Sequence, residues 1–273
     1  MTITRTQFEA VGASLSGAAE RFATLVETTD PAAETVPGWS VADLAAHVTA
    51  IARMYTVMLD PAASSDRDVS AITVFSLHDL NELMLVEFSE RDPRRLAGLL
   101  REHVGEMLRL SGELDPELLV PWLGGSRLPV GGALAHLLNE LLIHGRDIAL
   151  AAGADWDIPP ADAAWFFELF LYGMIRGGVS GLLDGTPGSA RRIAVEFHSA
   201  HTTSKTVVLQ GHQVSLEEPD GRADVRVSFD PAVLALVMFG RYGKARAVLT
   251  GKLVVRGPRP WLLPRFLRTV RVP

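Results

Sequence analysis

The chain has 273 residues, of which 48% are hydrophobic and 21% are charged, and its formal net charge is −6. This composition is typical of a globular protein with a buried core, and the mild negative charge without a dense basic cluster argues against nucleic-acid binding. Because the chain contains no cysteine, disulfides, thiolate metal ligands and a cysteine nucleophile are excluded.

The first third of the chain is predicted to be helical. Hydrophobic residues recur at helical spacing over residues 4–27. Pro37 and Gly38 then favour a turn, and Ser40 with Asp43 forms the pattern of a capping box, so a second helix is expected from Ser40 to about residue 59. A polar loop is expected over residues 61–68.

Further helices are predicted up to about residue 183. Two are expected over residues 74–89 and 93–111, with Pro93 at the first position of the second one. Residues 112–132 are rich in glycine and proline and predict a long loop. A strongly periodic helix follows over residues 133–152, and Gly153 suits its C-terminal end.

The last of these helices, over about residues 161–183, is the most apolar part of the chain. It carries Asp162, Glu168 and Arg176, so it is expected to be a buried helix rather than a membrane span. The polar start of the chain is unlike a signal peptide. We therefore expect a cytoplasmic protein.

The hydrophobic pattern changes near residues 184–190, from helical spacing to short, partly alternating runs. Strands are predicted over residues 191–198, 205–209, 213–217, 224–229 and 245–255, with helices over 231–239 and 258–270. The pattern therefore predicts a helical domain over residues 1–185 and a mixed α/β domain with a mainly antiparallel sheet over residues 190–273.

The segment between His136 and Asp147 contains the best candidates for a metal site. Glu140 and His144 are four residues apart, so they project from one side of a helix, one turn apart. A carboxylate and an imidazole suit zinc and similar divalent ions. His47, on an apolar helix face, is the candidate third ligand, since bundle cores can build such sites from facing helices. Three protein ligands leave a position for water or substrate, as in catalytic sites.

Other interpretations of the same residues remain open. A glutamate and a histidine four residues apart also occur as a simple polar pair, and His47 could be a core histidine bonded to the backbone. His136 is an alternative ligand, expected at the rim of the site. Asp147 either orients the imidazole of His144, contacts a substrate or pairs with Arg146.

The remaining candidates are weaker. His198 and His201 flank a predicted turn and could bind metal weakly. Trp39 is expected to pack as a hydrophobic anchor at the start of its helix, whereas Trp122 either lines a pocket or holds its loop in place. There is no phosphate-binding loop and no nucleophile elbow of the Gly-x-Ser-x-Gly type.

Four segments resemble a known family. Val36–His47 (VPGWSVADLAAH) and Asn139–Ala149 (NELLIHGRDIA) resemble the two signatures of the mycothiol-dependent maleylpyruvate isomerase family. Residues 223–231 (ADVRVSFDP) and 249–257 (LTGKLVVRG) resemble the sterol-carrier-protein-type domain that often follows its helical bundle.

The resemblance implies a fold, a ligand set and a chemistry. The fold would be a DinB-like four-helix bundle followed by a small sterol-carrier-like α/β domain. Zinc or a related divalent ion would be bound by His47, Glu140 and His144. Mycothiol would be the cosubstrate, and its addition to and elimination from a conjugated double bond would isomerise a small unsaturated acid.

Two other functions remain open at this point. Within enzymes, the same site could transfer the thiol to a small electrophile. From a different class, the protein could bind a lipid or small apolar ligand without catalysis, with a structural metal. Substrate recognition could also differ from that of the family, because Arg146 stands where many relatives carry an aromatic residue, and because Trp261 and Pro264 lie near an unusual proline-rich last helix.

Overall fold

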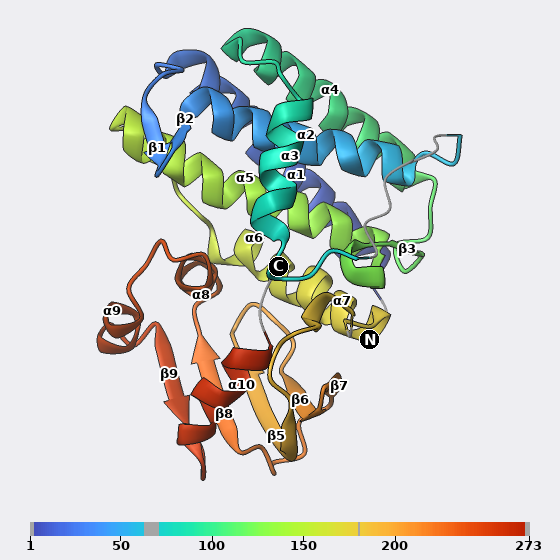
Figure 1. Ribbon diagram of the computed structural model, residues 1–273, viewed down its shortest axis with the longest axis vertical. Coiled ribbons are helices and arrows are strands. Elements are labelled where there is room, and N and C mark those ends of the chain that lie inside the picture. Colours follow the sequence, from blue (N-terminus) through green and yellow to red (C-terminus); the bar gives the residue numbers. More distant parts are fainter. Residues whose placement is uncertain (1–2, 63–70, 180, 271–273) are drawn as a thin grey trace. The chain divides into compact units, whose positions relative to one another are not determined.

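The computed structural model describes residues 3–62, 71–179 and 181–270 (Figure 1). The chain divides into two compact units. The helical unit comprises Met1–Asp68, Ser76–Val120 and Pro129–Ile158, and the sheet unit comprises Val69–Phe75, Pro121–Leu128 and Pro159–Pro273. Within the described part of the chain, no helix is both long and apolar enough to cross a membrane.

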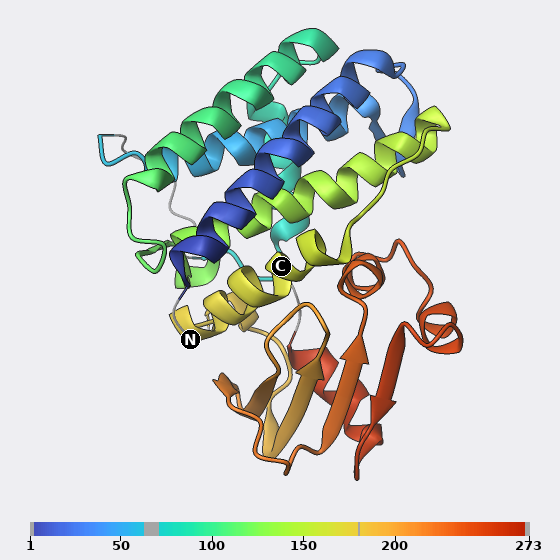
Figure 2. The same ribbon diagram turned by 180° about the vertical axis from the view of Figure 1, so that it is seen from behind.

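Four long helices form the core of the helical unit, namely α1 (Arg5–Thr28), α2 (Val41–Leu59), α4 (Pro93–Gly112) and α5 (Val130–Ala152). Both α1 and α2 pack against α4 and α5, so the four helices form a ring. Seen from behind in Figure 2, α1 lies between α4 and α5. The predicted four-helix bundle is confirmed.

Residue pairs along these helices give their relative directions. Glu20 of α1 pairs with Arg101 of α4, and Gly12 lies near Leu108, so these two helices are antiparallel. The aromatic ring of His47 contacts that of His144, and the ring of Tyr55 contacts that of His136, so α2 and α5 are antiparallel as well. In this bundle, α1 is therefore antiparallel to α4, and α2 is antiparallel to α5. Helices α2 and α5 face each other along their lengths.

The predicted start and stop signals of these helices are present in the structure. The side chain of Ser40 accepts a hydrogen bond from the backbone of Asp43, whose carboxylate accepts one in return, and α2 begins directly after this capping box. Pro93 is the first residue of α4. Gly153 ends α5 in the left-handed conformation, with φ of 65°. The short α3 (Leu77–Glu87) and the strands β1 (Glu34–Val36) and β2 (Trp39–Ser40) complete the unit.

The predicted long loop over residues 112–132 is wrong. The structure has a small hairpin there, with β3 (Leu119–Pro121), the turn η1 (Leu123–Gly125) and β4 (Arg127–Pro129). Helix α5 then begins at Val130, three residues earlier than predicted. Gly131 lies in its first turn, where a Cβ atom would lie 2.9 Å from the end of the Ile3 side chain. Most of the expected loop over residues 61–68 lies outside the described residues.

The sheet unit contains a five-stranded sheet of order β7-β6-β5-β8-β9. Its strands are β5 (Ser189–His198), β6 (Lys205–Gly211), β7 (Gln213–Glu217), β8 (Val225–Phe229) and β9 (Leu253–Arg256). Only the pair of β5 and β8 is parallel among these neighbours. The predicted mixed domain with a mainly antiparallel sheet is therefore confirmed.

Short helices accompany the sheet. The elements before the sheet are α6 (Pro160–Trp165), the π-helical segment η2 (Phe166–Leu171), α7 (Tyr172–Gly177) and the turn η3 (Gly181–Leu183). Two helices lie between β8 and β9, namely α8 (Pro231–Met238) and α9 (Lys244–Leu249). The turn η4 (Pro260–Leu262) and helix α10 (Leu263–Thr269) follow β9. The predicted strand over residues 245–255 is wrong in its first half, which forms α9. Its apolar residues Val248 and Leu249 are 52% and 87% exposed, so they do not occupy a buried strand.

One face of the sheet packs against α10 and α7. The buried residues that form this core are Tyr172, Ile193, Val195, Val207, Leu209, Val225, Val227, Leu262 and Phe266. The helices between Pro160 and Gly177 belong to the sheet unit, although their hydrophobic spacing resembles that of the bundle helices before them. The limits of independently folding domains at residues 185 and 190 stay a prediction.

Candidate metal centre

The two antiparallel helices α2 and α5 bring the three predicted ligands together inside the helical unit. His47 is on α2, while Glu140 and His144 are one turn apart on α5. The rings of His47 and His144 meet edge to face, with centroids 5.4 Å apart. His47 and Glu140 are only 4% and 8% exposed, so the site lies in the bundle core.

One carboxylate oxygen is the centre of this group. Oε2 of Glu140 lies 3.3 Å from Nε2 of His144 and 3.8 Å from Nε2 of His47. One ligand atom from each of the three residues lies within 4.8 Å of the others. Among the residues that the structure describes, no other group of three such side chains is close enough to hold a metal.

Asp147 occupies the place predicted for a residue that orients His144. Its Oδ2 atom lies 3.2 Å from Nδ1 of His144, and the carboxylate is buried. When Nδ1 carries a proton that it donates to Asp147, Nε2 is left facing Glu140. A histidine that ligates a metal commonly has this second partner, which fixes the ring and its tautomer.

The ionisation of these groups follows from burial and from their charged neighbours. Burial opposes ionisation of Glu140, but the contacts with His144 and His47 outweigh it and hold the pKa of the carboxyl well below its usual range. Burial lowers the pKa of His47. Burial acts in the same direction on His144, but Asp147 and Glu140 outweigh it and raise the pKa of His144 to about 9. Without a metal, the imidazolium of His144 therefore lies between two carboxylates.

The ionised carboxylate of Glu140 favours a cation at the position where the three ligands meet. A divalent ion would replace the proton on Nε2 of His144 and would find an ionised carboxylate and a neutral His47 beside it. Two imidazoles and one carboxylate are a common ligand set for zinc, and three protein ligands leave a coordination position open. The residues present therefore fit a divalent metal.

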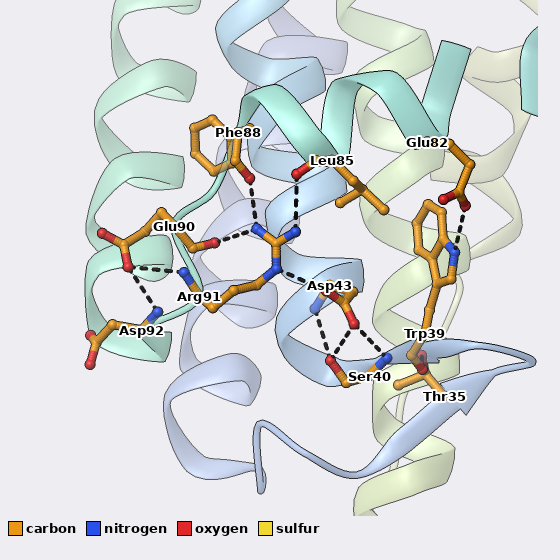
Figure 3. Close-up of polar contacts among 10 residues, drawn as sticks. All are labelled: Thr35, Trp39, Ser40, Asp43, Glu82, Leu85, Phe88, Glu90, Arg91 and Asp92. Atoms are coloured by element: carbon orange, nitrogen blue, oxygen red, sulfur yellow. Dashed lines mark hydrogen bonds and ion pairs between the residues drawn. The ribbon is translucent and has the colours of Figure 1, made fainter. Parts of the chain in front are cut away.

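The start of α2 is held by a polar network that Figure 3 shows. Arg91 donates from Nε to Asp43 and from its other nitrogens to the backbone carbonyls of Leu85, Phe88 and Glu90, so it ties the end of α3 to the capping box of α2. Trp39, directly before this capping box, places its ring 5.1 Å from that of His47.

Trp39 is therefore more than the hydrophobic anchor expected from sequence. Its Nε1 atom donates to Glu82 of α3 across 3.3 Å, as Figure 3 also shows. The indole thus contacts a candidate metal ligand with its ring and a neighbouring helix with its polar edge. The position of an aromatic residue just before a helix gave no signal for this contact.

The indole of Trp156 packs closely against α5 at Gly145, the residue after His144. The indole of Trp156 lies over this glycine and donates from Nε1 to the carbonyl oxygen of Leu142 across 3.0 Å. A Cβ atom at Gly145 would lie 2.1 Å from the indole ring. The absence of a side chain at Gly145 therefore allows Trp156 to cover the backbone of the ligand-bearing turn.

The other predicted candidates take different positions. His136 is buried rather than at the rim, and its Nε2 atom lies 3.6 Å from Oε1 of Glu140. His198 instead contacts Ser204, with 2.7 Å between Nδ1 and Oγ. Trp122 is buried in the sheet unit with its ring edge-on to Phe170, which favours the interpretation that it holds its loop in place.

Two models of known protein families match the chain. The model of the mycothiol maleylpyruvate isomerase N-terminal domain matches residues 13–149, which is half of the chain and includes all three candidate ligands. The chain belongs to the mycothiol maleylpyruvate isomerase family. The model of the SCP-2 sterol transfer family matches residues 186–260 in the sheet unit, as the sequence resemblance predicted.

Solved structures from this family share the fold. A crystal structure of the mycothiol-dependent maleylpyruvate isomerase is 16% identical to the chain, with a TM-score of 0.51 over 87% of this chain and 90% of that one. The structure of an H52A mutant of such an isomerase gives the same identity and TM-score over 91% and 92% of the two chains. No curated protein matches the chain.

Proposed function

We propose that the protein is a metal-dependent enzyme that uses mycothiol, a low-molecular-weight thiol, to act on a small unsaturated or electrophilic substrate. The observation that carries this proposal is the convergence of His47, Glu140 and His144 within 4.8 Å in the bundle core. Membership of the mycothiol maleylpyruvate isomerase family supports the choice of thiol. We expect zinc as the metal and the cytoplasm as the compartment, where thiols are kept reduced.

The ligand set explains why a thiol cosubstrate suits this site. A bound divalent ion with an open position supplies Lewis acidity that favours the thiolate, the nucleophilic form, over the thiol. The chain itself has no cysteine, so the sulfur must come from a cosubstrate. Asp147 holds the ring of His144 in place, and the indole of Trp39 packs edge to face against the ring of His47.

The reaction we propose is isomerisation of a conjugated acid. The thiolate adds to one carbon of the double bond, and the electron pair of that bond moves towards the conjugated carbonyl. The remaining single bond rotates, and elimination of the thiolate restores the double bond in the other geometry, so that no thiol is consumed. With a small electrophile that carries a leaving group instead of such a double bond, the same thiolate would form a C–S bond while the leaving group departs with its electron pair, which is S-transfer.

The experiment begins with metal analysis of protein purified without a polyhistidine tag. We expect one divalent ion per chain, and turnover of conjugated acids or simple electrophiles that requires added mycothiol, with glutathione as the comparison. In Glu140→Gln the carboxylate charge is lost at nearly constant size, so both metal content and turnover should fall. His198→Ala is the matched control and should keep both. Equal metal content in His144→Ala and His198→Ala would refute the ligand assignment.

A second candidate function is favoured by a cavity in the sheet unit. The cavity has a volume of about 620 Å³, and nearly all of its lining is apolar, including Phe167, Met174, Val227 and Phe266. Its size lies in the range of ligand-binding pockets, roughly 300–1,000 Å³. The alternative proposal is therefore a protein that binds a lipid or small apolar ligand in this cavity.

Mass spectrometry of the purified protein and titration with a fluorescent apolar probe test this alternative. Stoichiometric binding of such ligands, together with an absence of thiol-dependent turnover by metal-loaded protein, would favour the binding function. Thiol-dependent turnover would favour the enzyme, whether or not the cavity also holds a ligand.

A further inference from the structure

The two oxygen atoms of the Glu140 carboxylate face different partners. Oε2 faces the two candidate ligand histidines, 3.3 Å from His144 and 3.8 Å from His47. Oε1 faces His136, whose Nε2 atom is 3.6 Å away. The carboxylate therefore has one side towards the candidate metal position and one side towards a third histidine.

The position of His136 is fixed by its helix and by packing. It lies one turn before Glu140 on α5, so both side chains project from the same side of the helix. His136 is only 9% exposed. Its ring meets the ring of Tyr55 of α2 edge to face, with centroids 5.8 Å apart, and Tyr55 is fully buried. The imidazole is thus held against the carboxylate by the bundle core.

His136 is not itself placed as a ligand. The group whose ligand atoms all lie within 4.8 Å of one another consists of His47, Glu140 and His144 and does not include His136. His136 instead approaches the oxygen that faces away from this group. An N–H group at that position can donate to Oε1, which leaves Oε2 to bind the metal.

We propose that His136 is a positioning residue that binds Oε1 of Glu140 and thereby keeps this carboxylate a one-oxygen ligand. The inference rests on the metal site proposed above. The present distance of 3.6 Å is longer than a hydrogen bond of about 2.7–3.2 Å, so a small rotation of the carboxylate would be needed for this hydrogen bond to form. Partners of this kind orient metal ligands, and their loss lowers metal affinity about 10–100-fold.

The test compares variants that keep or remove the donor. His136→Gln retains an N–H group that can reach the carboxylate, whereas His136→Leu and the smaller His136→Ala have no donor. Cobalt(II) is the probe, because competition with a chelator gives its affinity and its visible absorption reports the coordination number. Circular dichroism of the metal-free variants shows which of them fold, and two donor-free variants guard against misfolding of one.

We expect affinity for cobalt to fall about 10–100-fold in the donor-free variants, with a changed absorption spectrum as the freed carboxylate binds through both oxygens. His136→Gln should retain most of the affinity and the wild-type spectrum. Unchanged affinity and spectrum in the donor-free variants would overturn the inference. An absorption spectrum that shows one ligand fewer in both His136→Gln and His136→Leu would also overturn the inference, because His136 would then itself be a metal ligand. Failure of the wild-type protein to bind cobalt would instead refute the proposed metal site, and this inference with it.

Discussion

The Nε atom of Arg91 donates a hydrogen bond to Oδ1 of Asp43 across 2.8 Å. The other oxygen of the same carboxylate accepts from the backbone and the hydroxyl of Ser40, at the first turn of α2. One carboxylate therefore closes the capping box of the helix that carries His47 and also ties this helix to the segment after α3. The position of the candidate ligand thus depends on a residue outside the metal site.

Replacement of Asp43 by alanine should destabilise the helical unit. Asp43→Ala removes the N3 half of the capping box while Ser40 remains as the N-cap, and it also removes the charged partner of Arg91. Gln7→Ala is the matched control, because Gln7 holds the same N3 position in the capping box of α1 and is uncharged. Urea unfolding should show a larger loss of stability for Asp43→Ala. An equal loss in the two variants would show that the Arg91 contact adds nothing.

The stability of the protein should also depend on pH through Asp43. Burial acts to raise the pKa of this carboxyl, but the hydrogen bonds from Ser40 and Arg91 outweigh it and lower the pKa below its usual value. Because the folded-state pKa is below that of the unfolded chain, about 3.9, this contribution is fully present above pH 4. It is lost as the pH falls through the folded-state pKa. The drop in unfolding free energy between pH 6 and pH 3 should therefore be smaller in Asp43→Asn than in the wild-type protein.

Gly145→Ala should displace Trp156 and disturb the ligand-bearing turn. The new methyl group would overlap the indole ring, and overpacking of this kind costs about 1–3 kcal/mol. The control is Gly105→Ala on the exposed side of α4, where a Cβ atom meets nothing within 4 Å. That change should stabilise its helix by about 0.5–1 kcal/mol. Thermal unfolding checks both signs, and a neutral Gly145→Ala would show that Trp156 moves aside at no cost.

Asp147→Ala should weaken metal binding without removing a ligand. Asp147 lies 3.2 Å from Nδ1 of His144, and loss of such a partner lowers metal affinity about 10–100-fold. Asp157→Ala changes an exposed carboxylate ten residues later and should leave the affinity as it is. Chelator competition at constant pH gives both values. Affinity of Asp147→Ala equal to that of the control would mean that Asp147 does not orient His144.

Local signals in the sequence accounted for most of the helical unit. The Ser40–Asp43 capping box, Pro93 and Gly153 each mark a helix end that the structure contains. The start of α5 was placed too late because Gly131 reads as a helix breaker. In the structure this glycine faces the end of the Ile3 side chain, more than a hundred residues earlier in the chain. Contacts of this kind leave no local trace in a sequence.

The same distinction explains α9. Val248 and Leu249 favour a strand in isolation, but their helix is made by local hydrogen bonds, such as that from the backbone N–H of Thr250 to the carbonyl of Arg246. At the candidate metal centre, the spacing of Glu140 and His144 was enough to pair them. The contact of Trp39 with His47 was not predicted, because it depends on how the strand before α2 turns.

The π-helical segment Phe166–Leu171 has a further consequence for variation in this protein. A π-helical turn contains one residue more than an α-helical turn. Deletion of a single residue from this segment would convert it into an ordinary helix, and the turns on its two sides would keep nearly their present orientation, because the wider turn already absorbs one extra residue. Phe167 and Leu171 within the segment and Tyr172 directly after it line the cavity of the sheet unit, so the loss of one residue would change which side chains of the segment reach the cavity. A relative that is one residue shorter here would therefore have a differently shaped cavity, even if every other lining residue were the same.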